Sequence, residues 1–66
     1  MTRLYETVKR LDAIITRKKL DTYKTRGLIS VRTGFLLGNI GPETPDSDEK
    51  LGKLRSAVQE ILGEVV

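Results

Sequence analysis

Apolar residues recur at alternating steps of three and four along the first segment of the chain. The residues in this pattern are Met1, Leu4, Val8, Leu11 and Ile15. This spacing places their side chains on one stripe of an α-helix, at heptad positions a and d. Thr2 is a suitable N-cap, and the basic residues Arg17, Lys18 and Lys19 complement the negative end of a helix dipole. The pattern predicts a helix over residues 3–20.

The last segment repeats the same alternation of apolar steps. Its apolar stripe consists of Leu51, Leu54, Val58, Ile61 and Val65. Pro42 and Pro45 interrupt regular structure before this stripe begins. Acidic residues follow the prolines, and acidic side chains are stabilising at the positive end of a helix dipole. We therefore predict a loop over residues 41–45 and a helix over residues 46–64.

The central segment fits two structures. Its apolar residues, which we expect in the core, include Leu28, Val31, Phe35, Leu36 and Ile40. Their spacing favours a helix over residues 27–40, whereas an alternation of apolar and polar positions in the same segment fits a hairpin at about 28–40. We favour the helix because a lone two-stranded hairpin is only marginally stable. In that helix Ser30, Gly34 and Gly38 form a seam of small residues, which would allow another helix to approach closely.

Together the three segments predict an all-α fold. We expect a three-helix up-down-up bundle that occupies residues 1–66 as a single small helical domain. The alternative is an α+β fold with the central hairpin. A core of this size supplies only about 3–5 kcal/mol, so we expect a homodimer. The predicted interface comprises Leu4, Val8, Leu11, Ile15, Gly34, Phe35 and Gly38.

Composition narrows the possible functions. The chain contains no cysteine and no histidine, so disulfides, thiolate metal sites and imidazole catalysis are excluded. We expect no enzymatic activity, no cofactor and no metal. The sequence also lacks a membrane-length apolar segment and the apolar core of a secretory signal. We therefore expect a cytoplasmic protein without a membrane partner.

Charge differs between the two halves of the chain. Residues 1–33 carry nine basic and three acidic side chains, and residues 34–66 carry three basic and six acidic ones. A basic half can bind a polyanion such as nucleic acid. Alternatively, the two halves can attract each other, within one chain or between two chains.

One stretch of the basic half resembles a known DNA-binding motif. The residues Gly27-Leu28-Ile29-Ser30-Val31-Arg32-Thr33-Gly34 resemble the turn and early recognition helix of helix-turn-helix DNA-binding proteins. The resemblance covers these eight residues and implies a helix that enters the major groove. The residues that would contact bases or phosphates are Arg17, Lys18, Lys19, Lys24, Arg26, Ser30, Arg32 and Thr33.

The sequence as a whole favours a small helical protein-interaction module that self-associates and presents a charged face to a partner protein. The alternative function is a small DNA-binding regulator that uses the element around residues 27–40.

Overall fold

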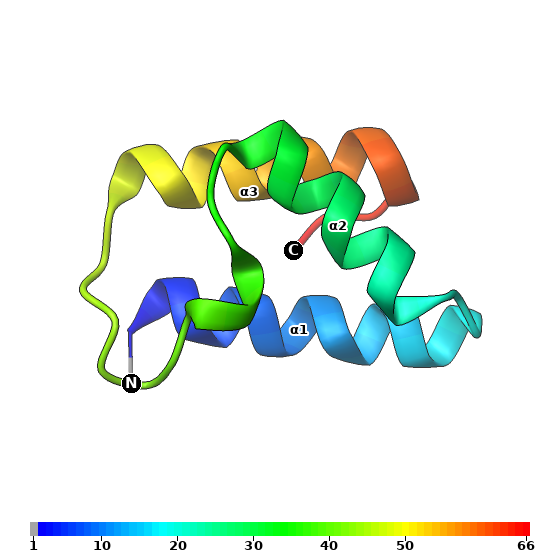
Figure 1. Cartoon of the computed structure of the whole chain (residues 1–66), viewed down its shortest axis with the longest axis horizontal. Coiled ribbons are helices and arrows are strands. Elements are labelled where there is room, and N and C mark those ends of the chain that lie inside the picture. The colour runs from blue at the N-terminus through cyan, green and yellow to red at the C-terminus, as the bar shows by residue number, and fades with distance from the viewer. Residues whose placement is uncertain (1) are drawn as a thin grey trace.

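The computed structural model describes residues 2–66, which form three α-helices and one short 3₁₀-helix. The elements are α1 (Arg3–Lys18), α2 (Thr22–Thr33), η1 (Leu37–Asn39) and α3 (Asp48–Leu62). Helices α1 and α3 lie side by side, and α2 crosses them obliquely and contacts both (Figure 1). The prediction of an all-helical fold is confirmed. The alternative central hairpin is not found, because the described residues contain no strand.

Each α-helix begins at a side chain that accepts a hydrogen bond from the backbone N–H three residues later. Thr2 makes this bond at 3.2 Å, as predicted, and Asp21 and Ser47 make theirs at 3.1 and 3.3 Å. Such caps satisfy donors that have no partner within the helix. The first and last helices therefore lie close to their predicted ranges, although α1 ends two residues earlier than predicted. Helix α3 is two residues shorter at each end, so the preceding loop extends beyond residues 41–45.

The helix predicted over residues 27–40 is wrong at both ends. Asp21 caps a helix that begins at Thr22, five residues before the predicted start at residue 27, so Gly27 lies in the helix interior. The helix ends at Gly34, whose φ of +75° is left-handed and is adopted by glycine at little cost. Gly38 lies in η1. Within residues 2–66, nothing beyond the adjoining residues lies within 4 Å of where a Cβ of Gly34 or Gly38 would be, so the predicted close approach is not seen there.

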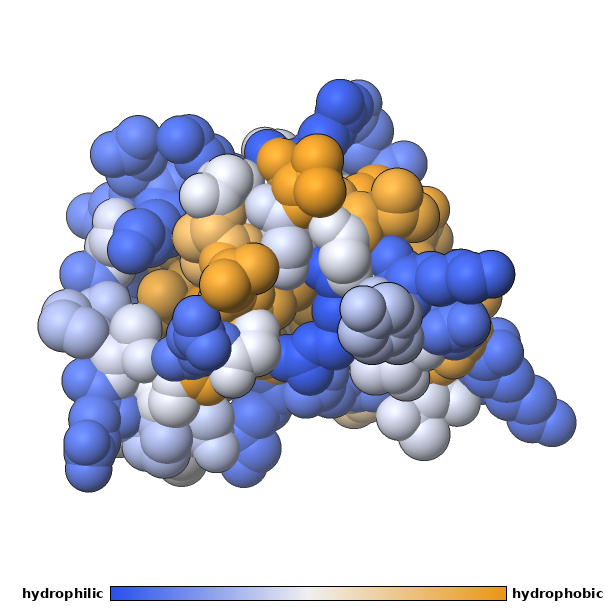
Figure 2. Space-filling view, in the orientation of Figure 1, coloured by the Kyte–Doolittle hydropathy of each residue, from blue (hydrophilic) through white to orange (hydrophobic). Residues whose placement is uncertain are grey.

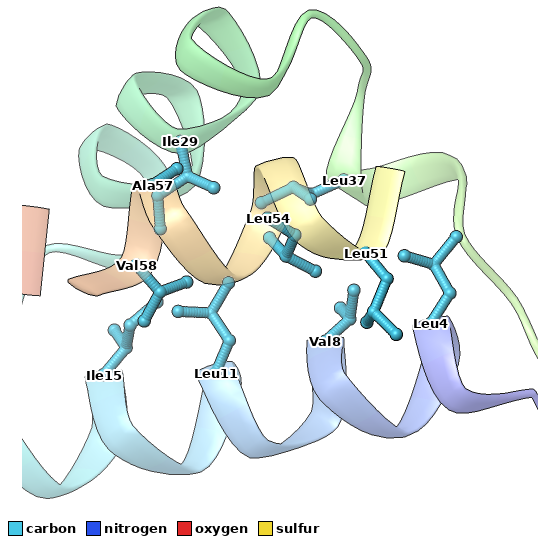
Figure 3. Close-up of a cluster of buried hydrophobic side chains, with 10 residues drawn as sticks. All are labelled: Leu4, Val8, Leu11, Ile15, Ile29, Leu37, Leu51, Leu54, Ala57 and Val58. Carbon is cyan, nitrogen blue, oxygen red and sulfur yellow. The ribbon is translucent and has the colours of Figure 1, made fainter. Parts of the chain in front are cut away.

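The core lies where α1, α2 and α3 meet. It consists of Leu4, Val8, Leu11, Ile15, Ile29, Leu37, Leu51, Leu54, Ala57 and Val58. The stripe of α1 faces that of α3, while Ile29 and Leu37 close the core from α2 and η1 (Figure 3). The four α1 residues predicted to form a dimer interface are 0–4% exposed. They belong to the interior of one chain, because α3 of the same chain covers the α1 stripe that was expected to face a second copy.

Ion pairs join α1 and α3 at both ends. At the N-terminal ends the Arg3 guanidinium contacts Asp46, at 3.5 Å, and Asp48. At the C-terminal ends Arg17 and Lys18 contact Glu64 at 2.7 and 3.2 Å. Because like ends are joined to like ends, α1 and α3 run in the same direction, as Figure 1 also shows. These pairs align the helices more than they stabilise the fold, because water and salt screen ion pairs at the surface.

A second contact at the N-terminal ends links the loop before α3 to the first turn of α1. The carboxylate of Asp46 accepts a hydrogen bond from the backbone N–H of Leu4 at 3.0 Å. This bond, with further help from Arg3, lowers the pKa of Asp46 from its ordinary value. The charged form of Asp46 therefore fastens the start of α1 to the loop.

No helix within residues 2–66 has the length and apolar character needed to cross a bilayer.

Candidate functional site

Helix α2 packs on the rest of the molecule through a narrow and partly polar stripe. The stripe consists of Thr25, Ile29 and Thr33, which are spaced four residues apart and are all buried. The Thr33 hydroxyl donates a hydrogen bond to the Ile29 carbonyl at 2.9 Å. Among residues 2–66 no buried side-chain polar atom lacks a partner. Both threonines are thus buried without leaving an unpaired buried polar atom, and Ile29 is the one large apolar side chain that α2 contributes to the core.

The other large apolar side chains of α2 point outward. Tyr23 is 89% exposed, Val31 84% and Leu28 59%, and Leu36 in the segment after α2 is 66% exposed. We call Tyr23, Gly27, Leu28, Val31 and Leu36 the α2 face.

The expected burial of Leu28, Val31 and Leu36 is therefore wrong. Helical geometry explains the exposure of Val31. Successive residues are rotated by about 100°, so Val31 lies about 200° from Ile29 and cannot share its side of the helix. Phe35 and Ile40, the other two residues of that expected set, are half-buried and pack against the core.

The α2 face borders an open groove of about 550 Å³. The residues that line it are Tyr23, Lys24, Arg26, Gly27, Ser30, Val31, Leu36 and Gly38. Figure 2 shows hydrophobic atoms exposed over α2 and the segment that follows it. Gly27 lies between Tyr23 and Val31, one helical turn from each, and nothing occupies the space within 4 Å of where its Cβ would be. The surface is therefore an apolar strip with a gap at its centre.

The residues of the α2 face expose roughly 500 Å² of accessible surface, taking full surfaces of about 150–200 Å² for the large side chains. The largest apolar patch on a typical monomer is about 300–600 Å² and is often functional. For a chain with a total accessible surface of 4415 Å² this is a large share. The α2 face is accordingly the candidate site.

Basic side chains flank the α2 face. Lys24 is exposed beside Tyr23. Arg26 contacts Asp12 of α1 at 2.9 Å, and Arg32 forms an ion pair with Glu60 of α3. These two arginines are used to hold α2 onto its neighbours, so Lys24 is the flanking charge most available to a ligand.

The residues predicted to contact nucleic acid do not form one free surface. Four of them are in ion pairs with carboxylates: Arg17, Lys18, Arg26 and Arg32. Thr33 is only 3% exposed and its hydroxyl bonds to backbone carbonyls. Ser30 accepts a hydrogen bond from the Leu37 N–H at 3.3 Å. Lys19 and Lys24 are exposed.

The structure lacks the turn that the helix-turn-helix resemblance implies. It places a turn at Gly27, but that residue lies inside α2, and the turn between α1 and α2 is formed by residues 19–21. The helix that would enter a groove therefore begins earlier than the motif requires.

Of the predicted interface residues, Phe35 is half-buried beneath the Lys50 ammonium, 5.7 Å from its ring centre, while Gly34 and Gly38 lie beyond the end of α2.

Sequence reasoning missed Tyr23 and Gly27 as site residues, although a signal was present. Tyr23, Gly27 and Val31 are spaced four residues apart, which places them on one side of any helix that contains all three.

Comparison with known proteins found no matching family model, no similar curated protein and no similar solved structure. The geometry of the α2 face therefore carries the functional argument.

Proposed function

We propose that this protein is a small three-helix up-down-up bundle that acts as a protein-interaction module and has no catalytic activity of its own. Its binding surface is the α2 face, and its partner is an apolar helix of another polypeptide chain. The observation that carries the proposal is that α2 buries polar residues and exposes apolar ones. Thr25 and Thr33 are buried, whereas Tyr23 and Val31 are exposed to water.

The energetics of covering this surface permit reversible binding. Covering about 500 Å² of accessible surface contributes at most roughly 12 kcal/mol at about 25 cal/mol per Å², the value for a wholly apolar patch. The loss of translational and rotational freedom costs about 4–15 kcal/mol, which offsets most of this gain. We therefore expect reversible binding of moderate strength.

The nucleic-acid alternative has less support from the geometry. Duplex binding depends on basic side chains that are free to neutralise phosphates. Four of the eight candidates are already engaged by carboxylates of the same chain. The experiment below includes an arm that tests this alternative.

A photo-crosslinking amino acid at position 31 tests the proposed function in cells. The matched control carries the same group at position 65, because Val65 is also 84% exposed but borders a different hollow beside Arg10 and Arg17. We expect discrete protein adducts from position 31 and none from position 65. Adducts that disappear after nuclease treatment would support nucleic acid instead, and equal labelling from both positions would refute a specific surface on α2.

A further inference from the structure

The α2 face has features that specify its occupant. Resting on the proposed function, we infer that the occupant is a second copy of this chain, with the two α2 helices packed antiparallel and crossing at Gly27. Three observations support this arrangement: the size of the surface, its symmetry about Gly27 and the position of Lys24.

The size of the surface matches a small symmetric dimer. Two copies of the α2 face would bury up to about 1,000 Å² in total, which is the lower limit for a specific interface. In a two-fold dimer the same patch is used twice, so no further surface is needed on either copy. The interface is small, and dissociation in the micromolar range is expected.

Tyr23 and Val31, the two most exposed apolar residues of α2, are arranged symmetrically about Gly27. Tyr23 lies four residues before Gly27 and Val31 four residues after it. When two such helices cross antiparallel at Gly27, Tyr23 of each copy lies level with Val31 of the other. The missing side chain at Gly27 lets the two backbones approach closely, and no atom of the same chain fills that space.

Charge selects the antiparallel arrangement. In a parallel pair with the same residues in contact, the two Lys24 side chains would lie level with each other. In the antiparallel pair crossing at Gly27 they lie six residues apart along the axis, about 9 Å at 1.5 Å per residue. That separation exceeds the Debye length of about 8 Å at physiological ionic strength, so their repulsion is largely screened. Antiparallel packing also places opposite ends of the two helix dipoles together.

Sedimentation velocity over a concentration series tests the second copy as occupant. We expect the wild type to change from 7.4 kDa to twice that mass as concentration rises. Val31→Asp should raise the dimer dissociation constant at least tenfold, whereas Val65→Asp should leave it unchanged. Gly27→Leu should also raise it at least tenfold, while the monomer stays folded by circular dichroism because leucine favours a helix. A wild type that remains monomeric, or a dimer that tolerates both Val31→Asp and Gly27→Leu, would overturn the inference.

The absence of cysteine allows the orientation to be tested by single substitutions. A disulfide requires Cβ atoms about 3.5–4.5 Å apart. Gly27→Cys should therefore form a covalent dimer on oxidation. A mixture of Tyr23→Cys and Val31→Cys should form the mixed dimer, and neither of these two variants should do so alone. Self-crosslinking of Tyr23→Cys alone would show a parallel pair and overturn the antiparallel inference.

The two proposals fail in different ways. If the wild type is monomeric while the crosslinker at position 31 captures a different protein, the second copy is excluded and the interaction module stands. If the wild type is monomeric and position 31 captures nothing, both proposals are refuted.

Discussion

Three glycines provide a quantitative test of the helix assignments. Gly27 in α2 and Gly52 in α3 both lie in helix interiors, and among the described residues no atom outside the local helix backbone lies within 4 Å of either Cβ position. Glycine in a helix interior costs about 1 kcal/mol relative to alanine. Alanine at either position should therefore stabilise the monomer by about this amount. Gly34, in contrast, has a φ of +75°, where a Cβ costs about 1–2 kcal/mol, so Gly34→Ala should be destabilising.

Thermal unfolding followed by circular dichroism measures these differences. For a domain of this size, 1 kcal/mol shifts the Tm by about 4–8 °C. At concentrations where the chain is monomeric, Gly27→Ala and Gly52→Ala should each raise the Tm by about this amount, and Gly34→Ala should lower it by a similar or larger amount. As concentration rises, Gly27→Ala should lose its advantage because the added methyl group separates the paired α2 helices, while Gly52→Ala should keep its advantage.

Two results would refute this reasoning. If Gly27→Ala is destabilising in the monomer, Gly27 does not lie in the interior of an exposed helix. If Gly27→Ala and Gly52→Ala behave identically at every concentration that permits association, Gly27 is not at the point where two chains approach.

The remaining predictions concern the hydrophobic core and the loss of folding stability at low pH. Leu11→Ala should cost about 2–5 kcal/mol, because Leu11 is fully buried between α1 and α3; urea unfolding measures this loss, and a cost below about 1 kcal/mol would contradict the core. The pKa of Asp46 is lowered in the folded chain, so its contribution to stability is complete above the ordinary value of 3.8 and is lost as pH falls through the lowered pKa. Asp46→Asn should therefore flatten the decline of the urea midpoint below about pH 4, whereas Glu43→Gln, at an exposed carboxylate of the same loop, should retain the wild-type decline; equal slopes for both variants would exclude the Asp46 contact.

Residue periodicity identified α1 and α3 because each helix buries one apolar stripe. Steps of three and four specify which side of a helix is covered, and Thr2 marked where α1 begins. Periodicity does not specify what covers the stripe. The α1 residues were therefore predicted to face a second chain, although α3 covers them within the same chain.

The central segment was predicted less well because its burial does not follow hydropathy. Thr25 and Thr33 are buried while Val31 is exposed, so the apolar pattern indicated the wrong side of α2. The boundaries depended on local chemistry instead: the Asp21 side chain starts the helix and the left-handed Gly34 ends it. The candidate site depends on this rotation of α2, which the packing of Ile29 in the core and the ion pairs of Arg26 and Arg32 determine together.

The pairing of α1 with α3 has a consequence for the order in which the chain matures. The stripe of α1 is covered by residues up to Val58, so it cannot be shielded from water while the ribosome is still making the second half of the protein. Until α3 emerges from the ribosome, the apolar stripe of α1 stays exposed to water, and chaperones bind exposed apolar surface of this kind. Folding is therefore expected to follow translation rather than accompany it.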